Sequence, residues 1–187
     1  TDSTTFDITV TDDELPKFTG VPNNISVNSN LGVCTAAPTW SGPSVTDNCG
    51  IDTLISTHDS GDTFQLGTTT VTYTATDIHG NVDSVSFTVE VADAEKPAIV
   101  GLPSDITQGN DVGDCSAAVT WTLPTATDNC EMDTLISSHA SGDVFQLGET
   151  VVTYTATDAA GNDSIASFKV TVTDTEKPGI ENLPADI

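Results

Sequence analysis

Acidic and amide side chains recur at two kinds of place in this sequence, and their oxygen atoms are the ligands that Ca²⁺ prefers. The first is a D-x-E-x-P phrase, found at 12–16, 93–97 and 174–178. The second is a D-x-x-G-N phrase at 77–81 and 158–162. In a sandwich of seven strands the last hairpin loop lies at the end where the first strand begins, so loop and phrase should meet there.

The sequence therefore predicts two oxygen-rich clusters, with calcium as the candidate cofactor. Their members are Asp93, Glu95, Asp158 and Asn162 between two repeats, and Asp12, Glu14, Asp77 and Asn81 one repeat earlier. Carboxylates held close together repel one another unless they spread into water or share a cation. The alternative is that each loop Asp only caps the amides of its own turn, and that each Glu pairs with lysine or solvent.

Four cysteines occur as two matched pairs, Cys34 with Cys49 and Cys115 with Cys130. There is no CxxC phrase or Cys/His cluster, so a secreted, disulfide-bearing protein is favoured over a metal or redox site. A disulfide needs Cα atoms within about 7 Å, whereas an extended segment of this length spans roughly 50 Å. The predicted bridges, Cys34–Cys49 and Cys115–Cys130, therefore require a turn near Gly42-Pro43 and near Leu123-Pro124.

No constellation in the sequence supports catalysis. Each histidine stands without a second histidine or a cysteine in a ligand spacing, and no Ser/His/Asp set or phosphate-binding glycine loop occurs. A D-N-C phrase recurs at 47–49 and 128–130, where alternation places Asp47 inward. We expect that carboxylate to accept backbone hydrogen bonds rather than to bind a ligand. The chain is predicted not to be an enzyme.

These residues recur because the chain is built from an 81-residue repeat. Residues 12–92 align with 93–173 without a gap, and more than half of the aligned positions are identical. Residues 1–11 match the end of a repeat and 174–187 match its beginning. The sequence thus predicts two complete repeats at 12–92 and 93–173, the last strand of a preceding repeat at 1–11 and the start of a following one at 174–187.

Alternation of apolar and polar residues predicts strands throughout each repeat, and no helical period is present. Val71, Tyr73 and Ala75 share one face, and Phe87 and Val89 share another. About seven strands are expected, near 24–28, 34–40, 44–49, 51–57, 62–66, 70–76 and 84–91. This number predicts an all-β fold of tandem immunoglobulin-like (fibronectin III-like) seven-stranded β-sandwiches. Trp40 and Trp121 are expected in the cores, beside the disulfides.

Charge limits the partners. The chain carries 28 acidic and 4 basic side chains, a formal net charge of -24. Such a charge repels nucleic acid and anionic membranes, so neither is an expected partner. No apolar run is long enough to insert into a membrane.

The combination and order of these phrases resembles the HYR (hyalin repeat) domain family. The phrases that carry the resemblance, beside D-x-E-x-P, are Asp47–Cys49, Gly61–Gly67, Val71–Asn81 and Ser86–Val91, each with a partner one repeat later. The resemblance implies an immunoglobulin-like sandwich in a large extracellular protein, an association with adhesion and no catalytic residues. Some members have further cysteines where this chain has Gly101 and Ala166. Nearly uniform copies look most like the stalks of bacterial surface adhesins or fibres, by analogy at the level of the fold.

The sequence predicts a structural or adhesive stalk or fibre segment of a secreted, cell-surface protein. Its partners would be neighbouring repeats of the same chain, with other copies in a fibre or surface glycans and proteins as further candidates. The alternatives are a carbohydrate- or protein-binding module that gains strength by avidity, and an accessory domain of a secreted enzyme.

Overall fold

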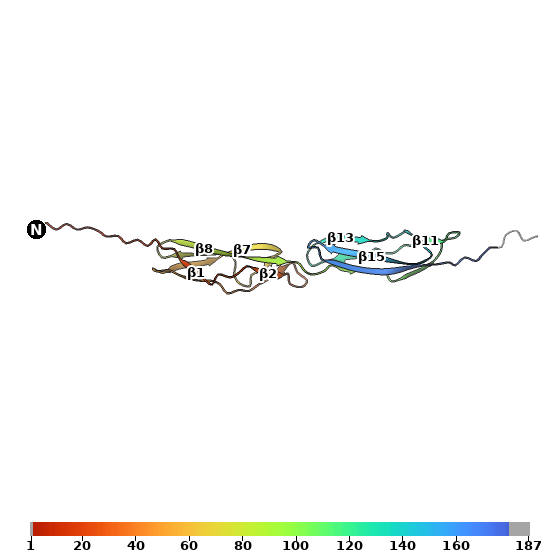
Figure 1. The fold of residues 1–187 in the computed structure, drawn as a ribbon, viewed down its shortest axis with the longest axis horizontal. Helices are drawn as coiled ribbons and strands as arrows, with labels where there is room; N and C mark the ends of the chain where they lie inside the picture. Colours follow the sequence, from red (N-terminus) through yellow and green to blue (C-terminus); the bar gives the residue numbers. More distant parts are fainter. Residues whose placement is uncertain (1, 180–187) are drawn as a thin grey trace, which may run out of the picture. The chain divides into compact units, whose positions relative to one another are not determined.

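The computed structural model describes residues 2–179, all of them in strands, turns or irregular segments. The chain divides into two compact units, Thr1–Asp93 and Ala94–Ile187, and Figure 1 shows the strands of each. The strands of the first unit are β1 (Lys17–Thr19), β2 (Ile25–Asn28), β3 (Thr35–Ala36), β4 (Ser44–Thr46), β5 (Ile51–Ser56), β6 (Phe64–Gln65), β7 (Gly67–Asp77) and β8 (Val82–Ala92). Those of the second are β9 (Ala98–Val100), β10 (Ile106–Gly109), β11 (Ser116–Ala118), β12 (Thr125–Thr127), β13 (Met132–Ser137), β14 (Val144–Gln146), β15 (Gly148–Asp158) and β16 (Asp163–Thr173).

Each unit is a β-sandwich with the same topology. In the first, a four-stranded sheet has the order β2-β8-β7-β5, and the pairs β1-β4 and β3-β6 make up the other layer. The second unit repeats this with β10-β16-β15-β13, β12-β9 and β11-β14. All pairings are antiparallel except β2 with β8 and β10 with β16, which are parallel. The predicted all-β sandwich class is confirmed.

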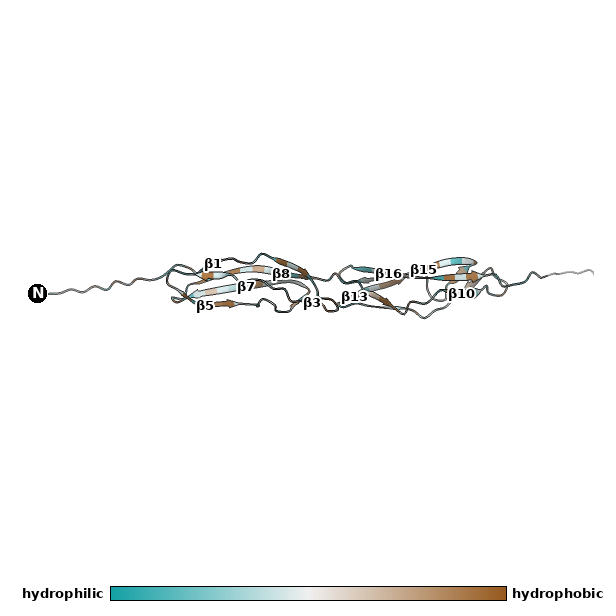
Figure 2. Cartoon of the chain, turned by 90° about the horizontal axis from the view of Figure 1, so that it is seen from below, coloured by the Kyte–Doolittle hydropathy of each residue, from teal (hydrophilic) through white to brown (hydrophobic). Residues whose placement is uncertain are grey.

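The core follows the predicted alternation. In β7 every second residue from Val71 to Asp77 is buried, and in β8 the same holds from Phe87 to Val91. Figure 2 shows hydrophobic and hydrophilic residues side by side along the strands. Trp40 packs on this core, with its ring 5.3 Å from that of Phe87 and its indole Nε1–H donating to Tyr73 Oη at 2.8 Å. The predicted core position of this tryptophan is confirmed.

The two ends of each sandwich are formed by different elements. The leading end holds the hairpin between β7 and β8, where Asp77 N–H donates to Asn81 O at 3.0 Å and Gly80 has a left-handed φ of 91°. The trailing end holds the end of β8, where Ser29 N–H donates to Ala92 O at 2.8 Å. The chain enters a repeat at its leading end and leaves it at its trailing end.

Each repeat has eight strands rather than the seven predicted. The additional strand is β1 in the first repeat and β9 in the second, each directly after a fully buried proline, Pro16 or Pro97. These strands have only three residues, too few to show an alternating pattern. They pair with β4 and β12.

That pairing overturns the turn predicted at Gly42-Pro43. Residues 44–49 do not run back beside 34–40, because β3 pairs with β6 and β4 pairs with β1. The segment from Cys34 to Cys49 instead crosses from the trailing end to the leading end. These ends are separated by the length of β8, whose eleven residues span roughly 36 Å.

The predicted bridges Cys34–Cys49 and Cys115–Cys130 are therefore wrong in this structure. Cys49 and Cys115 are free and exposed, whereas Cys34 and Cys130 are disulfide-bonded. A disulfide cannot span the length of a sandwich, because it holds its Cα atoms within about 7 Å. It follows that Trp40 does not pack beside an intra-repeat disulfide.

The described residues before β1, 2–16, form no strand. In the described residues 2–11, Phe6, Ile8 and Val10 are 77–90% exposed. These residues match Phe87, Val89 and Val91 in the sequence, and their role as the last strand of a preceding repeat stays a prediction. At the other end, residues 180–187 of the proposed following repeat lie outside the described residues. No helix in the described part of the chain is long and apolar enough to cross a membrane.

Candidate cation site at the leading end

The hairpin carboxylate is the most buried acidic group at the leading end. Asp77 is 1% exposed and its Oδ1 accepts the backbone N–H groups of His79 and Asn81, both at 2.8 Å. Its Oδ2 accepts Asn81 Nδ2–H at 2.7 Å. Asp158 is 2% exposed and accepts the same two groups of Asn162 at 2.8 Å. The predicted alternative role, capping of the turn, is present in both hairpins.

Burial and hydrogen bonding have opposite effects on the pKa of these carboxyl groups. Removal from water raises the pKa of Asp77, but the hydrogen bonds from the Asn81 side chain and from nearby backbone N–H groups outweigh it, so the net pKa is lowered. The pKa of Asp158 is lowered by the same opposition. Both groups are therefore carboxylates at neutral pH.

Asp12 reaches this hairpin from the linker before β1. Its side chain is 6% exposed, and its Oδ2 lies 3.2 Å from His79 Nδ1. The Asp12 carbonyl accepts Asn81 Nδ2–H at 3.2 Å. Desolvation raises the pKa of Asp12, but hydrogen bonds from Glu14 N–H, Cys49 and other neighbours lower it overall. The predicted meeting of linker and hairpin is thus present within the first unit.

Asp47 adds a third carboxylate. Its Oδ1 accepts Cys49 N–H at 2.9 Å and Gly50 N–H at 3.1 Å, as expected for a turn-capping residue. Its Oδ2 is buried and has no hydrogen-bond partner. Oxygen atoms of Asp12, Asp47 and Asp77 lie within 4.8 Å of one another. A buried carboxylate oxygen without a donor costs free energy unless something positive meets it.

This geometry fits a hard cation. Ca²⁺ takes 6–8 oxygen ligands at 2.3–2.6 Å, and three carboxylates supply several of them in one small volume. The sequence does not point to Asp47 as a ligand, because inward parity and turn capping already explain it. The unpartnered second oxygen becomes evident only when the turn and the linker are seen together.

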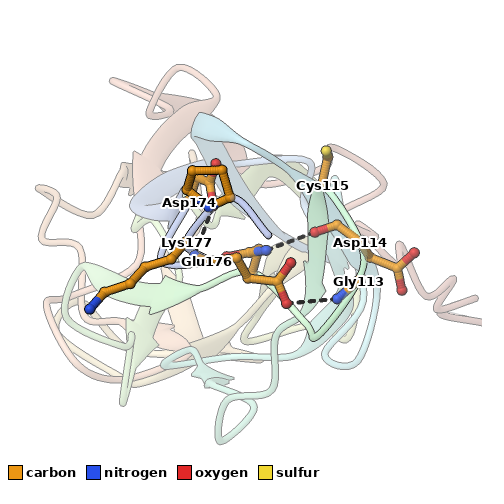
Figure 3. A pocket seen from close by; sticks show the side chains of 8 residues that line it. Gly113, Asp114, Cys115, Asp174, Glu176 and Lys177 are labelled. Carbon is orange, nitrogen blue, oxygen red and sulfur yellow. Dashed lines mark hydrogen bonds between the residues drawn. The ribbon is translucent and has the colours of Figure 1, made fainter. Parts of the chain in front are cut away.

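Glu14, a predicted ligand, does not belong to this group. It is exposed, and its backbone N–H donates to Asp12 Oδ1 at 3.3 Å. The equivalent glutamate of the third D-x-E-x-P phrase, Glu176, makes a side-chain contact. Glu176 Oε1 accepts Gly113 N–H at 2.8 Å, at the trailing end of the second unit (Figure 3). Glu176 thus contacts the repeat that it follows.

The second predicted cluster divides between the two units. Asp93 is the last residue of the first unit, where its Oδ1 accepts Ser29 Oγ–H at 3.4 Å. Glu95, Asp158 and Asn162 belong to the second unit. A cluster of these four residues stays a prediction. Within the second unit, Asp128 resembles Asp47: one oxygen accepts Cys130 N–H at 2.8 Å and the other is buried without a partner.

Comparison with known proteins gives a match over both repeats. The model of the HYR domain matches residues 11–91 and 92–172. Hyalin of Lytechinus variegatus is 38% identical over 97% of this chain and 36% of its own length. Hyalin of Strongylocentrotus purpuratus is 36% identical over 90% of the chain and 15% of its own length. The chain therefore spans about a third or less of these relatives.

Among solved structures, extracellular cadherin domains 3–6 of protocadherin gamma B2 cover 87% of this chain and 52% of their own, at 18% identity and a TM-score of 0.38.

Proposed function

Because the chain belongs to the HYR domain family, an extracellular and adhesion-related family of repeats, we propose that it is a spacer segment in the stalk or fibre of a larger surface protein. The observation that carries the proposal is the position of the two ends of each repeat. The chain enters at the leading end and leaves at the trailing end, separated by the eleven-residue strands β7 and β8. Each added repeat then contributes its own length.

The alternative of a glycan-binding module finds less support. Such modules need exposed aromatic rings as platforms, but Trp40 and Trp121 pack against the cores and donate to Tyr73 and Tyr154 at 2.8 Å. Phe6 is highly exposed, but it lies in the segment proposed to complete another repeat. The proposal is accordingly a mechanical role rather than a catalytic or sugar-binding one.

Copy number tests the spacer role. Chains with two, three and four copies of residues 93–173 should increase in maximum dimension by a constant step, roughly 40 Å per repeat from the strand length and linker. Small-angle X-ray scattering measures this dimension. A step that shrinks with each added copy would show that the repeats fold back on one another, which contradicts a spacer.

Calcium binding at the leading end is the second part of the proposal. Asp12, Asp47 and Asp77 would hold the ion, and the ion would neutralise their repulsion and fix the linker to the hairpin. Binding to the folded state alone stabilises it by RT ln(1 + [Ca²⁺]/Kd), about 2.7 kcal/mol at a hundredfold excess over Kd.

The test compares thermal unfolding in chelator and in millimolar Ca²⁺. The melting temperature of the first repeat should rise with Ca²⁺, and Asp47→Asn should remove the rise while keeping the side chain's shape. Asp52→Asn, on the exposed face of β5, is the matched control and should respond to Ca²⁺ like the unchanged chain. Equal melting temperatures with and without Ca²⁺ would leave the three carboxylates as turn-capping groups only. The spacer role would stand, because it rests on the strand geometry.

A further inference from the structure

Three side chains of different chemistry meet at the leading end of the first unit. A carboxylate oxygen of Asp12, the Sγ of Cys49 and a ring nitrogen of His79 lie within 4.8 Å of one another, and the three residues line a pocket of about 200 Å³. Asp12 comes from the linker before β1, Cys49 from the turn before β5 and His79 from the hairpin between β7 and β8. Because the fold brings them together from distant segments, no Cys/His phrase marks this group in the sequence.

The Asp12 carboxylate contacts both of the other groups. Its Oδ2 is 3.2 Å from His79 Nδ1, and the carboxylate accepts a hydrogen bond from the Cys49 thiol. That hydrogen bond, together with desolvation and nearby carboxylates, raises the pKa of Cys49. A cysteine nucleophile needs a lowered pKa and a histidine that takes the thiol proton. The group is therefore not arranged as a nucleophile and its base, but its three atoms can converge on one ion.

We propose that Asp12, Cys49 and His79 bind a zinc ion. Thiolate sulfur, imidazole nitrogen and carboxylate oxygen are the ligand atoms that Zn²⁺ takes, at about 2.3, 2.0 and 2.1 Å. In a tetrahedral site these bond lengths separate neighbouring ligand atoms by roughly 3.4–3.6 Å. The 3.2 Å between His79 Nδ1 and Asp12 Oδ2 is already close to this separation. Ca²⁺ takes oxygen ligands and would leave the sulfur and the nitrogen unused.

Exposure gives the ion access to its ligands. The Asp12 side chain is 6% exposed and the His79 side chain 47% exposed, and Cys49 is free and exposed. A zinc-bound thiol is deprotonated, so Cys49 releases its proton to the buffer as the bond from sulfur to zinc forms. The carboxylate and the thiolate then balance the two positive charges of the ion. Water fills the fourth position, as in other zinc sites with three protein ligands.

The histidine distinguishes the first repeat from the second. The position equivalent to His79 holds Ala160, and Cys130, the equivalent of Cys49, is disulfide-bonded. Two repeats of one fold would therefore differ in metal binding, with the ion joining linker, turn and hairpin in the first repeat. The zinc site stands apart from the spacer role, which rests on strand geometry. It also stands apart from Ca²⁺ binding, because a carboxylate has two oxygens and Asp12 can serve both ions.

Co²⁺ is the probe for the first test, because Zn²⁺ has a filled d shell and is spectroscopically silent. Co²⁺ accepts the same tetrahedral ligands, and a bond from cobalt to a thiolate gives an intense charge-transfer band in the near ultraviolet. Anaerobic titration of the 187-residue chain with Co²⁺ should produce this band, and added Zn²⁺ should remove it. A chain that gives no band, or a band that Zn²⁺ leaves in place, would overturn the proposal.

Substitutions locate the ion. Cys49→Ser and His79→Ala should each abolish the band, whereas Cys115→Ser, the matched control that removes the other free thiol, should keep it. His79→Ala should fold, because the second repeat has alanine at this position of its hairpin. Asp47→Asn should keep the band while losing the response to Ca²⁺, which separates the two metal proposals. Retention of the band in Cys49→Ser, or its loss in Cys115→Ser, would place the sulfur ligand elsewhere and contradict the site.

Protection of the thiol provides a second readout, without cobalt. Zn²⁺ should slow the alkylation of Cys49 by iodoacetamide, because the metal holds the thiolate. Cys115 is the internal control: it is also free and exposed, but the described residues that line its pocket include no histidine and no second cysteine. Peptide mass spectrometry follows both residues in one sample. Equal rates for Cys49 with and without Zn²⁺, or equal protection of Cys115, would refute the zinc site.

Discussion

The two ends of a repeat differ in chemistry more than in shape. The leading end of the first repeat collects three carboxylates, Asp12, Asp47 and Asp77, within 4.8 Å of one another. At the trailing end of the second repeat a neutral amide makes the central hydrogen bonds: Asn110 Oδ1 accepts Thr175 N–H at 2.9 Å, and Asn110 Nδ2–H donates to Asp114 O at 2.8 Å. The carboxylates at this end, such as Glu176, are exposed.

This difference concerns the hydrogen-bonding groups that each end presents. A trailing loop offers a backbone donor such as Gly113 N–H, which already holds Glu176 of the outgoing linker. A leading end offers acceptors. If the two ends differ in this way, substitutions at a leading end should cost more stability than substitutions at a trailing end.

Asp158→Ala should be the most damaging change. It removes the acceptor of Asn162 N–H and Asn162 Nδ2–H in a buried hairpin, and unsatisfied buried donors cost about 1–3 kcal/mol each. We expect a loss of about 3 kcal/mol from the unfolding free energy of the second repeat. Urea unfolding of a Trp40→Phe background, in which Trp121 is the only tryptophan, reports that repeat alone. A loss like that of Asp163→Ala, an exposed control, would contradict the special role of the leading end.

Acid should weaken the leading ends before the trailing ends. The pKa values of Asp12, Asp77 and Asp158 are lowered by their hydrogen bonds against the effect of desolvation. Their stabilisation is fully present above the unfolded pKa near 3.8 and is lost as pH falls below it toward the lowered folded pKa.

The check is a melting curve between pH 6 and pH 2 in chelator, with hydrogen exchange to locate the change. The amides of the 77–82 hairpin should lose protection first, and those of the 110–116 loop later. Simultaneous loss at both ends would mean that the carboxylates do not set the acid response.

Asn110→Ala should have a moderate effect at the trailing end. It removes the two short hydrogen bonds of the side chain, to Asp114 O and from Thr175 N–H, together with two longer ones. Because the loop is partly exposed, water replaces much of what is lost, so we expect a loss of about 1 kcal/mol. Trp121 fluorescence in urea measures it on the same background as Asp158→Ala. An effect as large as that of Asp158→Ala would abolish the distinction between the two ends.

Glu176→Gln should have the smallest effect. The amide oxygen can still accept Gly113 N–H, and the side chain is exposed, so stability should change by at most about 0.5 kcal/mol. Glu176→Ala serves as its comparison, because it removes the acceptor entirely. If both variants unfold identically in urea, this hydrogen bond does not contribute to the trailing end.

The long central strands could be predicted well from the sequence. Val71, Tyr73, Phe87 and Val89 alternate strictly, and β7 and β8 bury those residues. Alternation over many residues leaves one choice of inward face. The three residues of β1 carry too short a pattern to be recognised as a strand.

The cysteine spacing led to a wrong prediction for the middle of the repeat, the segment between Cys34 and Cys49. Their spacing within one repeat suggests pairing within it, which requires a turn between Cys34 and Cys49. The segment instead crosses from one end to the other, since its short strands pair with β6 and β1 rather than with each other. Which strands pair is a long-range property that local spacing does not contain.

The candidate site could be predicted in part. The meeting of Asp12 with the 77–81 hairpin follows from topology alone. Topology alone does not predict that Asp47 places an unpartnered oxygen in the cluster, nor that the Glu14 side chain lies outside it. Side-chain direction in a short linker depends on which loop supplies a backbone donor, as Gly113 does for Glu176.

The parallel pairing of β2 with β8 has a consequence for a protein under tension. The chain reaches β2 from the leading end and leaves β8 at the trailing end, and the two strands run in the same direction through the pairs Ile25–Val89 to Asn28–Ala92. A pull on the two termini therefore slides these strands past each other instead of peeling them apart. Their hydrogen bonds lie across the line of pull and must break together, so each repeat resists stretching through a shear-loaded clamp.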